Sequence, residues 1–160
     1  MFFATYLFTG LGKTFIAAVV MYNYNRWYPN NLVVFMAPTR PLVKQQLEAC
    51  HKIVGIHPSK TVELTGMISP KRREEFWKTK KVFFLTPQVM LSDLGRGSCQ
   101  PEDVRCIVVD EAHKALGNHA YAQVIETIFQ KNKYFRVLAL SATPGSDVPS
   151  VQQVTILLQS

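Results

Sequence analysis

Residues 9–14 (TGLGKT) form a glycine-rich stretch whose residue types suit the binding of phosphate groups. Gly10 and Gly12 allow the backbone to curl so that successive N–H groups point at phosphate oxygens. Lys13 would place a cation beside the β- and γ-phosphates of a nucleoside triphosphate, and the hydroxyl of Thr14 is a suitable magnesium ligand. The predicted phosphate-binding residues are Thr9, Gly10, Leu11, Gly12, Lys13 and Thr14.

Residues 108–113 (VVDEAH) deliver two adjacent carboxylates directly after an apolar run. Such a run predicts a buried strand, so Asp110 and Glu111 would lie at its carboxyl end, facing the glycine-rich loop. One carboxylate can hold Mg²⁺, usually through water, and the next can orient or deprotonate an attacking water. Two such acids could also mark a plain helix N-terminus, but the loop favours a nucleotide site. We therefore predict a site for a nucleoside triphosphate and Mg²⁺, with Thr14 and Asp110 as metal ligands.

Residues 141–145 (SATPG) follow another apolar run, and alone they would be an unremarkable loop. Beside the two carboxylates, the hydroxyls of Ser141 and Thr143 are suited to hydrogen-bond the region of His113 and relay the state of the nucleotide. The predicted coupling residues are Ser141, Ala142 and Thr143, and the predicted catalytic residues are Lys13, Asp110, Glu111 and His113.

Short apolar runs alternate with longer amphipathic ones, and these are the elements that must position the loops. Alternating strands and helices predict an α/β domain with a mostly parallel sheet and helices on both faces. Active residues then gather at the carboxyl ends of the strands. The first run, MFFATYLF, is interpreted as a buried strand rather than a signal peptide, since it has no basic segment before it. The expected strands are 2–8, 32–37, 60–64, 82–86, 104–109 and 135–140, and the expected helices are 13–27, 41–54, 70–79, 87–94, 120–131 and 147–158.

The composition indicates one soluble globular domain with a polyanionic partner. The 160 residues are 48% hydrophobic and 18% charged, and the net charge is +7. The densest basic stretch, residues 71–81, is interpreted as a solvated helix face in preference to a phosphate-binding patch. Three cysteines without metal-ligand spacing predict reduced thiols in an intracellular protein. No apolar run approaches the roughly 20 residues needed to cross a bilayer, so no membrane partner is expected.

The motifs TGLGKT, APTRPLV (37–43), TG (65–66), TPQV (86–89), DEAH (110–113) and SATPG (141–145), in this order, resemble the first RecA-like domain of a superfamily 2 helicase. Within that superfamily, the stretches LFTGLGKTFIAA, APTRPLVKQQ, LTPQVM, DEAHKALGNHAY and LALSATPGS most resemble the Fanconi anaemia group M family and its archaeal and fungal relatives. The resemblance covers nearly the whole chain after its first seven or so residues.

This resemblance implies a RecA-like P-loop fold, with ATP and Mg²⁺ as cofactors, and ATP-driven movement on DNA in the nucleus. It also implies remodelling of branched DNA, such as stalled replication forks and Holliday junctions. The nucleic-acid contacts would reach the sugar–phosphate backbone, so they would be sensitive to salt and largely independent of sequence. For any one of these loop residues, a structural role in a turn fits as well as a direct contact. The residues implied in these contacts are Pro38, Thr39, Arg40, Thr65, Gly66, Thr86 and Pro87.

The generic pattern GxxxxGK[ST] is not met, because Leu7 occupies its first glycine position, but the related pattern with another residue there is met. The chain departs from the family pattern in three places. Phe8 stands where family members typically carry proline. Few residues precede Thr9, which leaves no room for a segment that recognises adenine. The chain stops at Ser160, so we expect residues 1–160 to be an incomplete first RecA-like domain whose second domain is absent. The missing arginine of that domain can contribute about 10³–10⁵ in rate.

Three functions remain open on these residues. The first is the ATP-binding and hydrolysing half of a DNA helicase or translocase in replication-fork repair. Alone, it would bind nucleotide weakly and not unwind DNA, and repair-complex proteins would bind regions absent from it. The second is an inactive binding module for DNA or a helicase partner. The third is a related RNA helicase domain, although those relatives more often carry cysteine where Ala112 stands.

Overall fold

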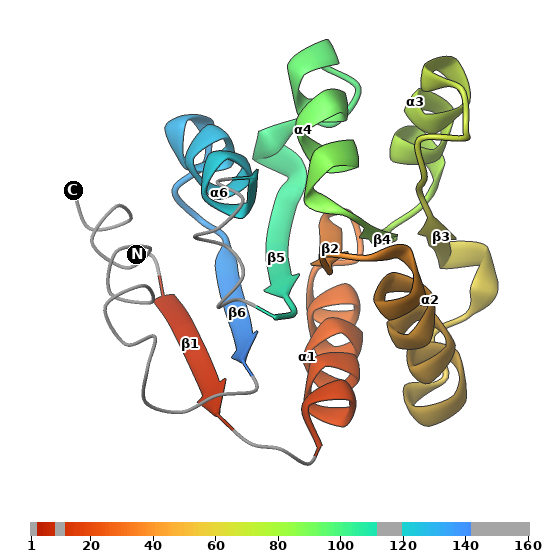
Figure 1. The fold of residues 1–160 in the computed structure, drawn as a ribbon, viewed down its shortest axis with the longest axis vertical. Helices are drawn as coiled ribbons and strands as arrows, with labels where there is room; N and C mark the ends of the chain where they lie inside the picture. The colour runs from red at the N-terminus through yellow and green to blue at the C-terminus, as the bar shows by residue number, and fades with distance from the viewer. Residues whose placement is uncertain (1–2, 9–11, 112–119, 142–160) are drawn as a thin grey trace.

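The computed structural model describes residues 3–8, 12–111 and 120–141. Within these residues, six strands form one sheet in the order β1-β6-β5-β2-β4-β3 (Figure 1). Every neighbouring pair of strands is parallel. The strands are β1 (Phe3–Phe8), β2 (Leu32–Met36), β3 (Thr61–Glu63), β4 (Val82–Leu85), β5 (Val104–Val109) and β6 (Arg136–Ser141).

The helices begin where the sequence places residues that favour a first turn. Pro41, Pro70 and Pro87 stand in the first turns of α2, α3 and α4, where a missing N–H costs nothing. Ser69 caps α3 by accepting a hydrogen bond from the Arg72 N–H at 3.4 Å. The helices are α1 (Lys13–Trp27), α2 (Arg40–Ala49), α3 (Pro70–Thr79), α4 (Pro87–Arg96) and α6 (Ala120–Lys131).

All six predicted strands and five of the predicted helices are confirmed, with small differences at their ends. The helix expected over 41–54 is α2 followed by a π-helical turn, Cys50–Val54, which stops at Gly55 with φ of 67°. The third strand is shorter than predicted. The expected helix 147–158 lies outside the described residues. No helix in the described part is both long and apolar enough to cross a membrane.

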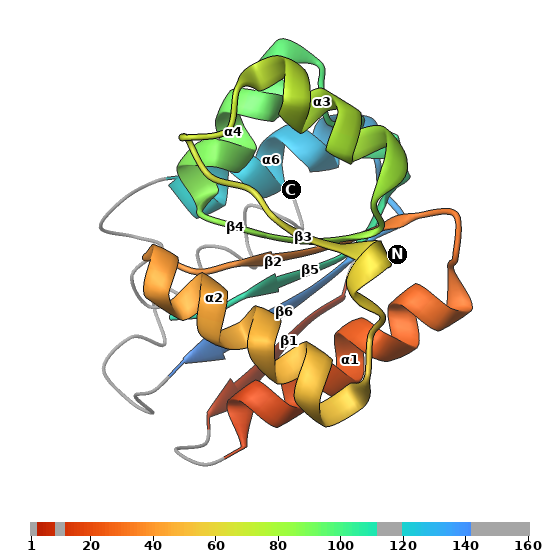
Figure 2. The ribbon, with the colours of Figure 1, turned by 90° about the vertical axis from the view of Figure 1, so that its right-hand side faces the viewer.

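Helices cover both faces of the sheet: α1 and α2 lie on one face, and α3, α4 and α6 lie on the other (Figure 2). The side chains of β2 alternate between these two faces. Val33 and Phe35 belong to the same core as Met21 of α1, whereas Val34 and Met36 belong to the opposite core. Every residue of β2 is buried. A strand covered on both faces therefore has a continuous apolar run instead of an alternating one.

The strand order divides the carboxyl edge of the sheet into two halves. One half is formed by β1, β6 and β5, which lead into the glycine-rich loop, the SATPG segment and the two carboxylates. The other half is formed by β2, β4 and β3, which lead into the three segments predicted to contact nucleic acid. Because parallel strands end at the same edge, the carboxyl ends of all six strands lie along one side of the sheet.

Candidate nucleotide-binding site

The first turn of α1 begins at Gly12, whose φ of 95° lies in the left-handed region. Its carbonyl accepts the N–H of Ile16 at 2.8 Å, so the helical hydrogen bonds start at this residue. A Cβ atom at Gly12 would meet nothing within 4 Å, which means that the backbone conformation, not crowding, calls for glycine here. Lys13 and Thr14 follow at once, so the N-terminal end of α1, with its partial positive charge, carries both residues.

A pocket of about 170 Å³ lies between the start of α1 and the end of β5. It brings together Lys13 and Thr14 with Asp110 and Glu111, which the sequence predicted to face each other across the edge of the sheet. The hydroxyl and carboxylate oxygens on its wall are the donors that Mg²⁺ prefers, so the pocket fits a magnesium ion held together with phosphates. The full lining is Lys13, Thr14, Leu42, Gln45, Gln46, Asp110, Glu111 and Leu140.

The backbone holds the two carboxylates in different conformations. The N–H of Asp110 donates to the carbonyl of Met36 at 2.9 Å, so Asp110 still belongs to the ladder between β5 and β2. Glu111 then turns into the left-handed region with φ of 54°, and its N–H donates to Oδ1 of Asp110 at 2.9 Å. A left-handed residue with a Cβ atom costs about 1–2 kcal/mol. Such strain is typical of functional sites, where the surrounding structure maintains it.

Gln46 is a pocket residue that the sequence reasoning missed. Its side chain is buried on α2, and Nε2 donates to the carbonyl of Thr14 at 3.0 Å. The amide therefore ties α2 to the first turn of α1, next to the predicted magnesium ligand. A signal was present in the sequence: Val43, Gln46 and Cys50 share one face of the helix at spacings of three and four, and a glutamine stands out among apolar residues there.

Tyr121 supports the carboxylates from α6, and no chemical signal in the sequence pointed to it. Its hydroxyl donates to the carbonyl of Asp110 at 3.1 Å, and its ring is buried. Burial raises the pKa of Tyr121 well above its usual value, and the charges of Asp110 and Glu111 raise it further. The hydroxyl therefore keeps its proton and remains a hydrogen-bond donor at neutral pH.

Some predicted site residues lie at the limit of the described structure. Ser141 ends β6 and is paired in register with Phe8, the last residue of β1. The coupling segment and the glycine-rich loop therefore start from neighbouring strands. Thr9, Gly10, Leu11, His113, Ala142 and Thr143 lie outside the described residues, and their roles stay predictions.

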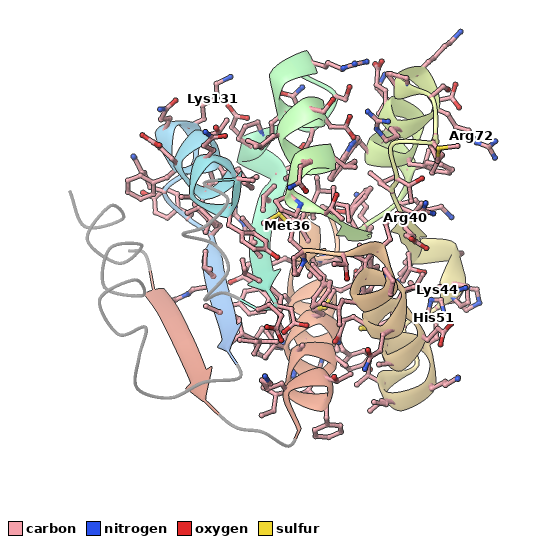
Figure 3. The ribbon with its side chains drawn as sticks, viewed as in Figure 1. Met36, Arg40, Lys44, His51, Arg72 and Lys131 are labelled. Carbon is pink, nitrogen blue, oxygen red and sulfur yellow. The ribbon has the colours of Figure 1, made fainter. Side chains whose placement is uncertain are left out.

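The segments predicted to contact nucleic acid include three exposed residues. Thr39 and Arg40 are exposed at the start of α2, and Figure 3 shows Arg40 above Lys44 along that helix. Gly66 is exposed in the loop that follows β3. A Cβ atom at Gly66 would meet nothing within 4 Å, so a ligand could approach its backbone closely.

The other members of this set are less accessible. Thr65 and Pro87 are buried, so neither presents an exposed side chain to a ligand. Thr86 and Pro38 are half-buried. Thr86 also precedes α4 as its N-cap residue, and its carbonyl accepts the N–H of Met90 at 3.2 Å. The structure therefore gives Thr86 a local structural role at the start of α4 beside its predicted one.

The predicted reduced state of the cysteines agrees with the structure: Cys50, Cys99 and Cys106 are free and buried. Burial raises the pKa of Cys50 to about 11 and that of Cys106 to about 12, so both remain thiols at neutral pH. Neither lines the nucleotide pocket.

Comparison with known sequences gives a consistent set of relatives. A family model described as "Type III restriction enzyme, res subunit" matches residues 4–146. Over 146 residues the chain is 60% identical to the Fanconi anemia group M protein homolog of Mus musculus and 53% identical to the ATP-dependent DNA helicase fml1 of Schizosaccharomyces pombe. These matches cover 91% of this chain but only 7% and 18% of the two relatives.

Comparison with solved structures agrees with this result. The helicase domain of Hef from Pyrococcus furiosus is 36% identical and superposes with a TM-score of 0.83, covering 99% of this chain and 33% of that chain. The predicted fold, a RecA-like α/β domain with a parallel sheet, is thereby confirmed. Because the family model matches most of the sequence, this chain belongs to the family of the type III restriction enzyme res subunit, and it is homologous to helicases of the Fanconi anaemia group M type.

Proposed function

We propose that this chain is the ATP-binding half of a DNA helicase or translocase, equivalent to a first RecA-like domain. One observation carries the proposal: Lys13, Thr14, Asp110 and Glu111, which are far apart in the sequence, line a single pocket. Two relatives named as ATP-dependent DNA helicases, fml1 and mph1, support the assignment. The whole protein would remodel branched DNA in replication-fork repair, in the nucleus, together with repair proteins.

Each pocket residue has a role in this proposal. Lys13 binds the β- and γ-phosphates, while Thr14 and Asp110 hold Mg²⁺ directly or through water. When bound, Mg²⁺ neutralises the charge that develops on the phosphates during hydrolysis. Glu111 orients the attacking water and accepts its proton. The water oxygen bonds to the γ-phosphorus while the bond from that phosphorus to the β–γ bridging oxygen breaks and ADP leaves. Gln46 and Tyr121 hold the backbone of this site in place through the carbonyls of Thr14 and Asp110.

DNA would bind at the other half of the same edge, over the ends of β2, β4 and β3. The exposed residues Thr39, Arg40 and Gly66 supply a hydroxyl, a guanidinium and an open backbone, which are groups that suit phosphate and sugar contacts. The net charge of +7 favours a polyanion at such a surface. α2 runs between the two halves, since it begins at Arg40 and carries Gln46 to the nucleotide pocket.

The test of the nucleotide site is a titration of a fluorescent ATP analogue with Mg²⁺ into the purified chain. We expect saturable binding that Lys13→Ala abolishes. Lys131→Ala is the matched control, because it removes the same charge from α6 (Figure 3), which lies on the opposite face of the sheet from α1 (Figure 2). Equal binding by wild type and Lys13→Ala would refute the proposed site.

The test of the substrate is competition between branched DNA and duplex RNA for the wild-type chain, with Arg40→Ala alongside. The proposal expects branched DNA to compete better and Arg40→Ala to weaken binding similarly for all sequences, with a smaller salt dependence. Preference for duplex RNA would favour the RNA helicase alternative. DNA binding without any nucleotide binding would favour the inactive binding module.

A further inference from the structure

A buried ion pair on the face of the sheet opposite α1 is used by no step described so far. Arg73 of α3 pairs with Asp93 of α4: Nη2 and Oδ1 are 2.8 Å apart, and Nε donates to Oδ1 at 2.9 Å and to Oδ2 at 3.0 Å. The indole Nε1 of Trp77 donates to Oδ2 of the same carboxylate at 2.9 Å. Arg73 is 4% exposed and Asp93 is fully buried, so water does not screen this cluster.

The same guanidinium also holds the loop that follows β3. Its Nη1 donates to the carbonyl of Ile68 at 2.6 Å and to that of Thr65 at 3.5 Å. The loop is closed by a further bond, in which the N–H of Ile68 donates to the carbonyl of Thr65 at 3.1 Å. Two carbonyls on either side of Gly66 are therefore fixed by one side chain from α3.

The carboxylate end of the cluster holds α4, the helix that starts beside Thr86. Asp93 lies in this helix, and its backbone carbonyl accepts the N–H of Ser98 at 3.0 Å. Asp93 is therefore held through its backbone as well as through its carboxylate. Trp77 stacks on Phe83 of β4, with ring centroids 4.0 Å apart. One buried cluster thus connects the loop after β3, the strand β4 and the helix after β4.

We propose that Arg73 is a positioning residue for nucleic-acid binding, which sets the place of the exposed Gly66 backbone relative to the start of α4. The inference rests on the proposed function, because it assumes that both segments contact the DNA backbone. Apolar residues of similar volume could fill this space without a charge, so the specific contribution of the ion pair is geometric. Only arginine presents a rigid planar fork that can serve a carboxylate and two carbonyls together.

The decisive variant is Arg73→Lys. Lysine keeps the charge opposite Asp93 but lacks the second set of N–H groups, so the carbonyl of Ile68 loses its donor and that of Thr65 keeps only the N–H of Ile68. We expect DNA affinity to fall about tenfold. This loss corresponds to the entropic cost of fixing about one backbone residue, which the loop would then have to meet when DNA binds. Binding of the fluorescent ATP analogue should stay within about twofold of wild type, because the nucleotide pocket lies in the other half of the edge. Arg72→Lys is the matched control, since Arg72 is the exposed neighbour on the same helix.

A second variant separates positioning from general stability. Trp77→Phe removes one hydrogen bond to Asp93 but leaves the contacts of Arg73 with the loop, so it should lower the melting temperature without the tenfold loss in DNA affinity. Wild-type DNA affinity in Arg73→Lys, or an equal loss in Arg73→Lys and Trp77→Phe, would overturn the inference. The proposed function fails instead if the wild-type chain does not bind DNA, or if it binds DNA and Arg40→Ala does not weaken that binding.

Hydrogen exchange of the wild-type chain covers the case in which Arg73→Lys does not fold. The inference requires the amide of Ile68 to be protected in the absence of DNA, because Arg73 holds the loop before any ligand arrives. Rapid exchange of this amide in the free chain would show a loop that orders only on binding, and would also overturn the inference.

Discussion

Among the described residues, Glu111 is the only one other than glycine with a positive φ, and this makes a sharp prediction possible. In most positions, alanine is more stable than glycine, because glycine loses more conformational freedom on folding. At Glu111 we expect the opposite order: Glu111→Gly should be more stable than Glu111→Ala. The comparison uses two variants that both lack the carboxylate, so it isolates the effect of the Cβ atom.

The magnitude follows from two opposing effects. The left-handed conformation costs a residue with a Cβ atom about 1–2 kcal/mol. Glycine avoids this cost, but it lowers the free energy of unfolding by about 0.5–1 kcal/mol relative to alanine, because the unfolded chain has more conformational freedom at glycine. The middle values of these ranges leave the glycine variant more stable by about 0.75 kcal/mol, within limits of about 0–1.5 kcal/mol. Glu126, which is exposed within α6, supplies the matched control. There the free energy of unfolding of Glu126→Ala should exceed that of Glu126→Gly by about 1 kcal/mol.

The assay is urea denaturation of the four variants, with the midpoint compared at an equal slope. In thermal melts, a difference of 1 kcal/mol corresponds to roughly 2–4 °C for a chain of this size. An alanine variant at Glu111 as stable as the glycine variant, or more so, would refute the reasoning. In that case Glu111 would not be held in the left-handed conformation, and the geometry described for the two carboxylates would be wrong.

Four further predictions concern the hydrogen bond from Tyr121 to Asp110, the reactivity of Cys50, the pH dependence of stability and the proposed DNA surface. Tyr121→Phe removes the donor to the Asp110 carbonyl, so the free energy of unfolding in urea should fall by about 1 kcal/mol. Because burial raises the pKa of Cys50 to about 11, it should resist a thiol reagent at pH 8 until urea unfolds the chain. Unfolded thiols ionise first, at about pH 9, so the free energy of unfolding should decline from there towards pH 11. Gly66→Asp should weaken DNA binding in a filter assay at unchanged melting temperature. The same change at the exposed Gly95 should leave DNA binding unchanged.

The fold could be predicted from the sequence because each element has a local cause. The run VVFM of β2 is apolar throughout, as a strand between two helical layers requires, and the prolines at 41, 70 and 87 mark helix starts. The glycine-rich loop and the two carboxylates could be predicted because each follows its strand directly. The meeting of Lys13 and Thr14 with the two carboxylates in one pocket then follows from the rule that parallel strands end at one edge.

The supporting residues could not be predicted in the same way. Gln46, Tyr121, Arg73 and Asp93 act through atoms from distant segments, mostly backbone carbonyls that have no signature in the sequence. The basic stretch 71–81 illustrates the limit. Its interpretation as a solvated helix face holds for exposed Arg72, whereas its neighbour Arg73 is buried against a carboxylate from another helix.

The sequence by itself indicated which residues suit phosphate and magnesium chemistry, since backbone freedom, charge and hydroxyl groups are properties of single residues and short spacings. It also determined the alternation of strands and helices, which follows from local hydrophobic patterns. Only the tertiary structure decided the strand order β1-β6-β5-β2-β4-β3, and with it the division of one edge into a proposed nucleotide half and a proposed DNA half. Strand order depends on pairing between segments far apart in the chain, and no local pattern encodes the free energy of that pairing.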